Sequence, residues 1–439
     1  MCKRRFYTFL SLVLAAALSA PADATWSIVV ANRVTKEIAV ASATCVSNTN
    51  LLRRLPVVRV DVGAAAAQAL VDGSGRNRNI IWSELQVGTD PATLLQILAD
   101  GDAFHQSRQY GIVDSQGRSI TFTGSRDGPF ADGVTGQFGD FSYAIQGNVL
   151  TGMPVIAMAE AALRDTPGGL PEKLMAAMEA ARSMGGDGRC SCDNLHPDSC
   201  GSPPPDFRRS AFVGFMVVTR RGDTDGGPCR NGGSCAGGNY YLKLNARNPP
   251  RSDPVPRLRT MFDEWRVGLV GIPDAVESVA TLSTNHLPNN GAASATLSID
   301  LRDWQAAPAT ELTGLSIDHD PRGSAGSVSI GPISDLGGGV FEAELTAAAS
   351  AGVSRLMITA RYPDGPDADD LDEEVVLIPS PRIFVQDRRA DLNRDGAVDL
   401  ADLSMLLASF GTDAAGDVDE DGDTDLSDLA LLLGSIVPE

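Results

Sequence analysis

The chain has 439 residues, of which 43% are apolar and 21% charged, and its formal net charge is −20. At about 100–200 residues per domain this length predicts two to four domains, and the apolar content excludes a chain that is disordered throughout. The acidic balance argues against a nucleic-acid partner, because phosphate contacts need clustered Lys and Arg. It also argues against docking on anionic lipid.

Residues 1–24 have the pattern of a secretory signal peptide. Lys3–Arg5 form a basic start, Phe6–Ala20 an apolar run and Ala22–Ala24 a cleavage site of small residues. The apolar run is shorter than the roughly 20 residues that a spanning helix needs, so an uncleaved membrane anchor is the weaker alternative. No later segment is long enough to span. The sequence therefore predicts a protein that is secreted, on the cell surface or periplasmic.

Cleavage after Ala24 would make Thr25 the first residue of the mature chain. A free α-amino group has a pKa of about 7.7–8.0 and can act as a general base. It could take the proton of its own residue's hydroxyl and activate that oxygen as a nucleophile. A first residue of Thr, Ser or Cys is the requirement for N-terminal-nucleophile (Ntn) hydrolases, although it also occurs by chance.

Six cysteines remain after the predicted cleavage, which removes Cys2: Cys45, Cys190, Cys192, Cys200, Cys229 and Cys235. An even number in an oxidising compartment favours disulfides, with fifteen possible pairings. A zinc site is the alternative, but Cys-Ser-Cys and Cys-x7-Cys are not usual tetrahedral spacings.

The pattern between residues 25 and 268 mixes strands with helices. We expect strands at 25–30, 37–41, 109–113, 119–122, 143–145, 212–219 and 240–244, and helices at 155–164 and 170–184. Strand pairs followed by helices and further strands predict an α+β layered domain.

Several stretches of this region occur in the order of one bacterial family: Thr25–Val29, Gly63–Ala69, Arg108–Asp114, Thr123–Ser125, Ile145–Leu150 and Gly185–Asp187. They resemble the family called domain of unknown function 1028, which is grouped with Ntn-hydrolase-like folds. The resemblance implies a four-layer αββα sandwich over residues 25–268. Cys-rich insertions at 189–206 and 222–239 depart from the family pattern.

The same resemblance raises Thr25 as the nucleophile of an amidohydrolase, although no activity is securely assigned to the family. The other catalytic candidates come from chemistry alone. Gln146 and Asn148 could donate to a tetrahedral oxyanion, and Asp187 could orient the site or hold a substrate ammonium group. Asn148 could equally be a turn residue and Asp187 a helix-end cap. Some relatives carry cell-wall-binding modules, so peptide amides of the cell wall are the expected substrate class.

Short strands replace helices between residues 271 and 385, at 281–283, 295–301, 313–317, 327–330, 340–345, 355–360 and 373–377. Turn-separated strands of this kind predict a β-sandwich. The segments 285–295 and 338–345 resemble the bacterial invasin-type Ig-like repeat. The resemblance implies an Ig-like spacer or adhesive module.

Two acidic loops near the C-terminus repeat one spacing of oxygen ligands, at loop positions 1, 3, 5, 9 and 12, with a backbone carbonyl at position 7. This spacing suits calcium, which takes 6–8 oxygens. The first loop offers Asp391, Asn393, Asp395, Ala397, Asp399 and Asp402, and the second Asp417, Asp419, Asp421, Asp423, Asp425 and Asp428. Each loop leads into an expected amphipathic helix, with Leu403, Leu406, Leu407 and Phe410 in the first and Leu429, Leu432, Leu433 and Ile436 in the second.

Asp at position 12, one helix after each EF-hand-like loop and the tandem repeat resemble a type I dockerin. The resemblance implies a small all-α module over residues 391–439 that binds about two structural calcium ions, with a cohesin-like or cell-surface partner. Positions 10 and 11, Leu400–Ala401 and Leu426–Ser427, depart from the usual Ser-Thr pair. Asp423 and Thr424 lead us to expect weaker binding at the second loop.

Three functions follow as hypotheses. The first is a secreted Ntn amidohydrolase. The second is a non-catalytic extracellular binding or adhesion protein, and the third a dockerin-borne accessory of polysaccharide catabolism. The sequence contains no Gly-x-Ser-x-Gly, His-Glu-x-x-His or phosphate-binding Gly-Lys-Ser/Thr motif, and no carboxylate pair for glycoside hydrolysis is identifiable.

Overall fold

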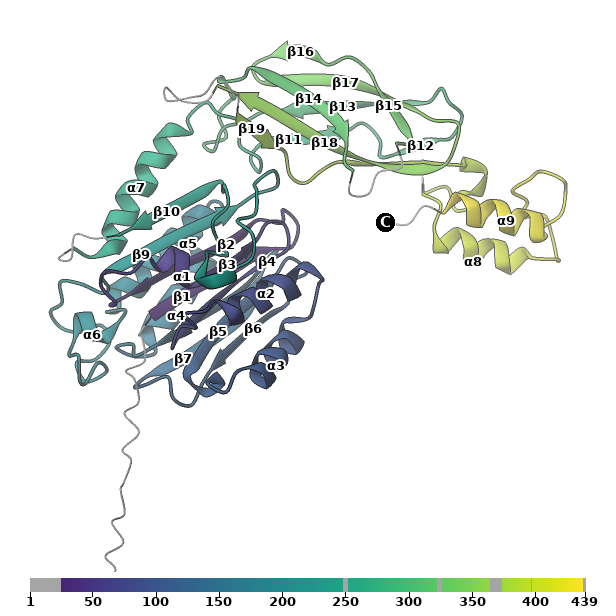
Figure 1. The fold of residues 1–439 in the computed structure, drawn as a ribbon. Helices are drawn as coiled ribbons and strands as arrows, with labels where there is room; N and C mark the ends of the chain where they lie inside the picture. The colour runs from purple at the N-terminus through teal and green to yellow at the C-terminus, as the bar shows by residue number, and fades with distance from the viewer. Residues whose placement is uncertain (1–24, 248–251, 322–325, 364–372, 396, 437–439) are drawn as a thin grey trace, which may run out of the picture.

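The computed structural model describes residues 25–247, 252–321, 326–363, 373–395 and 397–436. The predicted signal peptide and Gly396 of the first acidic loop lie outside these ranges. The described chain forms an N-terminal region of two sheets and several helices, then a β-sandwich, then two short helices (Figure 1). Its helices are all too short or too polar to cross a membrane.

Two antiparallel sheets pack face to face in the N-terminal region. The larger sheet has the order β10-β9-β2-β1-β8-β7 and the smaller the order β3-β4-β5-β6. The central strands β1 and β2 are buried along their whole length, and their segments of the sequence are largely apolar and contain no charged residue. The ten strands are β1 (Thr25–Asn32), β2 (Ile38–Thr44), β3 (Pro56–Arg59), β4 (Gly63–Ala69), β5 (Arg108–Asp114), β6 (Ser119–Thr123), β7 (Ala131–Phe138), β8 (Phe141–Asn148), β9 (Val213–Thr219) and β10 (Leu242–Ala246).

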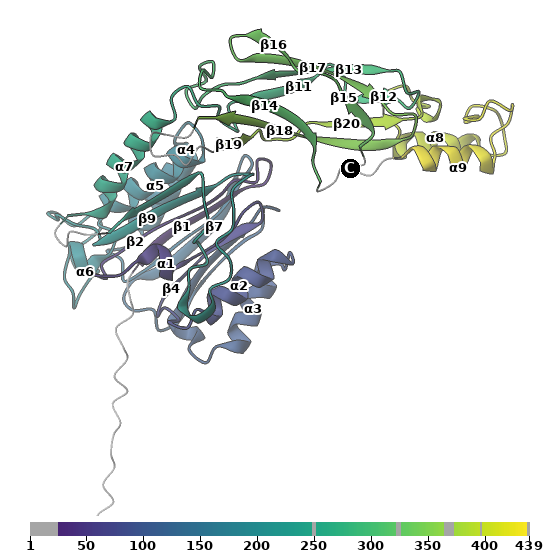
Figure 2. The ribbon, with the colours of Figure 1, turned by 45° about the horizontal axis from the view of Figure 1, so that its top comes forward.

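Helices cover the outer faces of both sheets. Alternation along β1 divides its side chains: Trp26 and Ile28 face the helices, whereas Val29 faces the smaller sheet. The layers therefore run helix, sheet, sheet, helix (Figures 1 and 2). The helices on the larger sheet are α4 (Pro154–Asp165), α5 (Leu170–Ser183) and α7 (Pro254–Gly268), and those on the smaller are α2 (Arg76–Gln86) and α3 (Pro91–Gly101). Short helices at α1 (Leu51–Arg54), η1 (His105–Ser107), α6 (Gly188–Ser191) and η2 (Arg230–Gly232) lie in the connections.

The next region is all β, as predicted. Its two sheets have the orders β11-β13-β17-β15, with β16 beside β17, and β12-β20-β18-β14, with β19 beside β18. Both sheets contribute to one apolar core, for example Leu297 and Ile358. The strands are β11 (Val279–Leu282), β12 (His286–Pro288), β13 (Ser294–Asp300), β14 (Gly314–His319), β15 (Val328–Ile330), β16 (Ser334–Gly337), β17 (Val340–Ala347), β18 (Gly352–Tyr362), β19 (Glu373–Val376) and β20 (Arg382–Gln386).

The C-terminal helices α8 (Leu400–Ser409) and α9 (Leu426–Ser435) follow the short helix η3 (Arg388–Ala390) and the two acidic loops. Each begins with a capping box, in which the side chain of the N-cap residue accepts the backbone N–H of the third helical residue and the side chain of that residue accepts the N–H of the N-cap. Leu406 and Leu432 are buried between the helices. The expectation that Leu407 and Leu433 would also pack there is wrong, because they are 55% and 50% exposed.

One strand is shifted from its predicted position. We expect a strand at 240–244, but β10 begins at Leu242. Tyr240 and Tyr241 instead line a cavity where the N-terminal region meets the β-sandwich.

Candidate functional site

Thr25 is the first residue of β1 and lies between two strand partners, Thr44 of β2 and Asn148 of β8. Its side chain is 3% exposed. Because the next residue, Trp26, packs under the helices, the side chain of Thr25 is on the face turned toward the smaller sheet. The structure thus brings two of the predicted site residues, Thr25 and Asn148, together at one end of the larger sheet.

Two glutamines of the smaller sheet form a hydrogen-bond chain that begins at Thr25. Gln68 Nε2 donates to the Thr25 carbonyl at 3.0 Å and to Gln109 Oε1 at 2.7 Å. Gln109 Nε2 donates in turn to the Gly147 carbonyl at 2.9 Å, and Gln68 Oε1 accepts the hydroxyl of Ser27. A network of uncharged amides therefore fixes the end of β1 between the sheets. The sequence offers one signal for Gln68, a single polar residue in an otherwise Gly/Ala strand.

Gln146 lies one step deeper between the sheets. It pairs with Ser27 rather than Thr25, and it packs so closely on Gly111 of β5 that a Cβ there would overlap its amide. Neither amide atom has a hydrogen-bond partner among the described residues. Asn148 donates from Nδ2 to the Asp127 carbonyl at 3.1 Å. Of the two amides predicted as oxyanion donors, Asn148 is therefore the one beside Thr25.

A buried carboxyl group that sequence reasoning missed lies next to Asn148. Asp127, in the loop between β6 and β7, is 1% exposed. Its Oδ2 accepts the Gly124 N–H at 2.7 Å, and its Oδ1 has no partner among the described residues. Burial raises the pKa of Asp127 to about 6, although the Gly124 N–H and the charge of Arg108 act in the other direction. An acidic residue in a polar loop carries no sequence signal that would reveal this burial.

Asp187 accepts hydrogen bonds from backbone N–H groups at the same end of the sheet. It accepts hydrogen bonds from the Cys45 N–H at 2.6 Å, the Arg189 N–H at 3.1 Å and Arg189 Nη2 at 2.9 Å. Burial raises the pKa of Asp187, and the Arg189 guanidinium opposes that rise. Asp187 is the N-cap of α6. A helix-end cap is the alternative role that the sequence analysis gave for Asp187.

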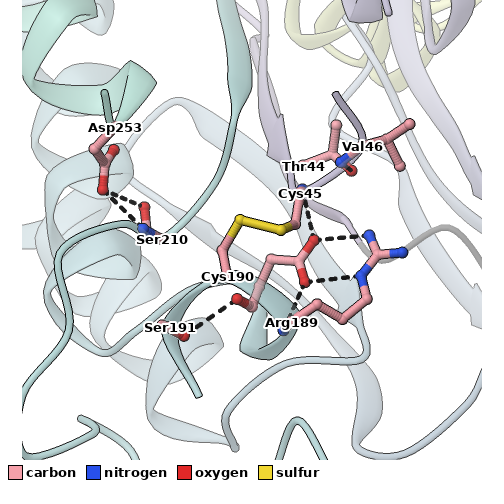
Figure 3. Close-up of a disulfide and its surroundings, with 9 residues drawn as sticks. Thr44, Cys45, Val46, Arg189, Cys190, Ser191, Ser210 and Asp253 are labelled. Atoms are coloured by element: carbon pink, nitrogen blue, oxygen red, sulfur yellow. Dashed lines mark hydrogen bonds and ion pairs between the residues drawn. A yellow bond between two sulfur atoms is a disulfide. The ribbon is translucent and has the colours of Figure 1, made fainter. Parts of the chain in front are cut away.

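Three disulfides confirm the predicted state of the cysteines: Cys45–Cys190, Cys192–Cys200 and Cys229–Cys235. Cys45–Cys190 joins the end of β2 to α6 beside Arg189 and Ser191, with Cα atoms 5.7 Å apart (Figure 3). Pairing uses all six thiols, so the zinc alternative is excluded. Disulfides persist in oxidising compartments, and they fit an extracellular or surface protein.

Charged side chains occupy the opposite end of the larger sheet. Arg220, directly after β9, donates from Nε to Glu37 and from Nη1 to Asp274, each at 2.8 Å. Its guanidinium lies 3.7 Å from the centre of the Tyr241 ring. Burial opposes ionisation of Asp274, but Arg220 outweighs this effect and lowers the pKa of Asp274. A buried ion cluster therefore fixes this end.

Two further arginines tie the N-terminal region to the β-sandwich. Arg221 Nη1 donates to Ser380 Oγ at 2.7 Å. Arg266 of α7 forms an ion pair with Glu172, and its guanidinium lies 4.5 Å from the Trp265 ring centre and 4.9 Å from that of Trp304 in the sandwich. These contacts hold the two regions together at one junction, visible above the sheets in Figure 1.

A cavity of about 310 Å³ lies at this junction. Two of the chain's four tryptophans and three of its six tyrosines line it. These five are Tyr240, Tyr241, Trp265, Trp304 and Tyr362. The sequence did not reveal the cavity, because its walls come from the connection between β9 and β10, from α7 and the segment after it, and from the sandwich.

The second acidic loop gathers its carboxylates. Oxygens of Asp417, Asp419 and Asp421 lie within 4.8 Å of one another, as do those of Asp423, Asp425 and Asp428. Asp428 is fully buried and accepts the N–H groups of Asp419 at 3.0 Å and Asp425 at 2.7 Å. The charge of Asp421 raises the pKa of Asp423, which is the effect of like charges crowded together.

The first acidic loop repeats part of this arrangement. Asp402 is fully buried and accepts the N–H groups of Asn393 at 3.1 Å and Asp399 at 2.9 Å. Asn393 Nδ2 donates to Asp395 Oδ2 at 2.9 Å. Asp391 and Ala397 lie in the same loop, whose position 6 is outside the described residues.

Residues 25–193 match a family of unknown function, DUF1028. The resemblance predicted from the sequence motifs is confirmed over this range, which ends before β9. No curated protein sequence matches the chain.

Several solved structures resemble parts of the chain. A DUF1028-family protein of Silicibacter pomeroyi is 19% identical with a TM-score of 0.41, over 55% of this chain and 85% of that one. The adhesin InvE of Yersinia pseudotuberculosis is 17% identical with a TM-score of 0.19, over 25% of this chain and 26% of that one. The Escherichia coli adhesin FdeC is 11% identical with a TM-score of 0.19, over 84% of this chain and 66% of that one. At such low identity and TM-score these remain likenesses and assign no activity.

Proposed function

We propose that the chain is an extracellular binding protein whose ligand site is the cavity between its N-terminal region and its β-sandwich. The observation that carries this proposal is the cavity itself, with a volume of about 310 Å³ and five aromatic side chains in its wall. Ligand sites are typically concave, about 300–1,000 Å³ in volume, largely apolar, and frequent where domains meet. The ion pairs around Arg220 hold the walls in place before a ligand arrives, which lowers the entropy cost of binding.

A thermal-shift screen of the full chain against small sugars, quaternary amines, inorganic anions and short peptides tests this function. Replacing Trp304 by alanine should abolish every saturable shift that originates in the cavity. The control is Trp82→Ala, because Trp82 also lies under an arginine, 3.9 Å from Arg59, but on α2. A screen without any saturable, Trp304-dependent shift would refute the proposal.

A second candidate function, Ntn amidohydrolase activity, is favoured by the surroundings of Thr25. The DUF1028 match begins at this residue, and uncharged amides from three strands surround it. In this proposal the amine released by cleavage takes the proton from Thr25 Oγ, which attacks an amide carbonyl of a cell-wall peptide. Asn148 Nδ2 would turn from the Asp127 carbonyl to donate a hydrogen bond to the oxyanion. Gln146, which lies one step deeper between the sheets, would be a second amide donor for the same site. Asp187 would hold the backbone rather than the substrate.

Thr25 variants of the processed protein test this candidate. Thr25→Ala should abolish turnover of peptide or muropeptide amides with unchanged unfolding, and Thr25→Ser should keep part of it. N-terminal sequencing must first find Thr25 at the start. Full activity in Thr25→Ala, or a different first residue, would exclude this mechanism.

We further propose that each acidic loop holds one calcium ion. The donors would be the side chains of Asp391, Asn393, Asp395, Asp399 and Asp402 with the Ala397 carbonyl, and those of Asp417, Asp419, Asp421, Asp425 and Asp428 with the Asp423 carbonyl. An all-oxygen donor set is the one that calcium prefers, and the like-charge crowding at Asp423 is what a divalent cation would relieve. The ion would supply charge neutralisation that lets the loops close and the short helices pack.

Calorimetry and circular dichroism of the full chain test the calcium proposal. We expect uptake of about two ions, weaker at the second loop, and a loss of helix signal on chelation, since ten-residue helices do not persist alone in water. Asp402→Asn and Asp428→Asn should each remove one binding event. Unchanged helicity in excess chelator, or no uptake at millimolar calcium, would contradict it.

A protein partner for this C-terminal module is the natural extension of the proposal. Leu400 and Leu426 are both 71% exposed at the starts of their helices, and the half-exposed Leu407 and Leu433 repeat the same pairing. Matched exposed apolar residues on both helices favour a cohesin-like or cell-surface partner, despite the departure from the Ser-Thr pattern. An accessory role in polysaccharide catabolism would follow from such a partner.

A further inference from the structure

We infer that the junction cavity binds an uncharged sugar ring of an extracellular glycan. This inference rests on the proposed binding function and names its ligand class. A pyranose ring presents apolar C–H faces and a rim of hydroxyl groups. It therefore needs flat apolar walls together with hydrogen-bonding groups, and it needs no net charge in the site.

The walls of the cavity supply flat apolar surface from both regions. Tyr241 and Trp265 form an edge-to-face pair with ring centres 5.0 Å apart, and Trp304 and Tyr362 contribute from the sandwich. Aromatic side chains provide large contact areas that lose little conformational entropy on binding. A sugar ring can stack on such surfaces, whereas a flexible aliphatic chain would leave the polar groups of the wall unpaired.

A cationic ligand is disfavoured because the protein's own arginines already occupy the cation sites. Arg220 lies 3.7 Å from the ring centre of Tyr241, and Arg266 lies within 5 Å of both Trp265 and Trp304. A quaternary ammonium group binds to the faces of aromatic rings. It would have to compete here with two guanidinium groups of the same charge.

An anionic ligand is disfavoured by the balance of charges in the wall. Arg220 and Arg221 are the arginines of the wall, and four carboxylates line it with them: Asp223, Asp274, Glu373 and Glu374. Arg220 is already paired with Glu37 and Asp274. An anion would therefore meet an excess of negative charge in the wall. Arg220 could not bind it without giving up one of its two carboxylate partners.

The polar groups that remain match a polyol. Trp304 lines the cavity, and its Nε1 is buried without a hydrogen-bond partner among the described residues, so a small rotation of the ring would offer this donor to a ligand oxygen. The half-buried Asp223 and the exposed Asn239 line the same cavity. Asp223 Oδ2 already accepts the N–H groups of Arg220 and Tyr241 at 2.9 and 2.8 Å, so its Oδ1 and the Asn239 side chain are the acceptors offered to hydroxyl protons. A ligand whose hydroxyl groups both donate and accept can bond to all three, and the unmade bond of the Trp304 donor is costly.

Tryptophan fluorescence and calorimetry on the full chain test this inference with cellotriose, xylotriose, maltotriose and diacetylchitobiose as probes. At least one probe should bind saturably with a dissociation constant of about 1 mM or tighter. Trp304→Ala should weaken that binding at least about tenfold, and Trp304→Phe, which keeps a ring but loses the N–H donor, by less. Trp82→Ala should leave it unchanged. The phenylalanine variant keeps the test valid if the alanine variant does not fold.

Tetramethylammonium chloride and sodium sulfate separate the possible outcomes. If either binds in a Trp304-dependent way and no sugar does, the binding function stands and the assignment to sugar is overturned. If none of the probes binds and the wider screen is also empty, both the function and the assignment fall. Sugar binding that survives Trp304→Ala would place the sugar elsewhere and overturn the inference.

Discussion

Thr25 and Arg220, at opposite ends of the larger sheet, are held by different kinds of polar group. At the start of β1, Thr25 is fixed by the uncharged amides of Gln68 and Gln109. Beyond the other end of the same strand, Arg220 is buried between the carboxylates of Glu37 and Asp274. The groups that hold Thr25 are therefore dipoles, whereas those that hold Arg220 are full charges; the buried pair Asp187–Arg189 lies at the Thr25 end but bonds to the backbone of Cys45.

This difference decides what each end can do. A neutral amide hydrogen bond contributes only about 1 kcal/mol net to stability, so the amides around Thr25 can change partners and adapt to a reacting group. A buried ion cluster is stable only when every charge keeps its partner. The Arg220 end is therefore suited to fixing the junction and its cavity in one geometry.

The largest effect should come from removing the central charge of the ion cluster. Arg220→Met leaves Glu37 and Asp274 buried without their cation, and we expect the free energy of unfolding to fall by about 3–5 kcal/mol. Urea unfolding measures it. The matched control is Arg33→Met, because Arg33 pairs with Asp140 at 3.1 Å where both side chains are half exposed, and its loss should cost less than about 1 kcal/mol. Equal effects in the two variants would remove the contrast between buried and exposed charge.

The parts predicted correctly from the sequence depend on residues close together in the chain. The two C-terminal helices were expected directly after the acidic repeats, which are a local pattern, and α8 and α9 begin there. The largely apolar segment of β1 is equally local. The family resemblance raised Thr25 as a candidate, whereas Asn148 was chosen from its chemistry alone, since no local pattern links the two residues.

The parts that were missed depend on contacts between distant residues. Arg220 is separated in the sequence from Asp274 by 54 positions and from Glu37 by 183. No spacing of residues could therefore predict the ion cluster or the cavity beside it. Helix α2 begins with the polar stretch Arg76–Asn79. Two of these residues, Asn77 and Arg78, are buried, so the sequence lacks the apolar pattern that would have predicted the helix. Helix α7 alternates apolar and charged residues, and it was absent from the predicted elements.

A smaller effect is expected from the amide end. Gln109→Leu keeps the size of the side chain but removes the partner of Gln68 Nε2 and of the Gly147 carbonyl. Buried groups left unpaired in this way cost about 1–3 kcal/mol. The control Gln96→Leu changes an exposed glutamine on α3 that donates to Asp100 at 2.7 Å, and it should alter stability by less than about 0.5 kcal/mol. A Gln109 effect as large as that of Arg220 would mean that the amides are no more adaptable than the charges.

The smallest effect should be a pH dependence at the Thr25 end, where Asp127 is the buried carboxyl. Its pKa is raised from 3.8 to about 6 by burial, so the folded chain holds this proton more tightly than the unfolded chain does. Its contribution to stability is therefore present below about pH 4 and is lost as the pH rises toward 6. Asp127→Asn keeps an acceptor for the Gly124 N–H and cannot ionise. Relative to the natural protein, the variant should gain on the order of 1 kcal/mol between pH 4 and 7, measured by urea unfolding at each pH. Parallel stability curves for the two proteins would show that Asp127 is not held in its neutral form, and a carboxylate would then lie beside Asn148 among the groups that hold Thr25.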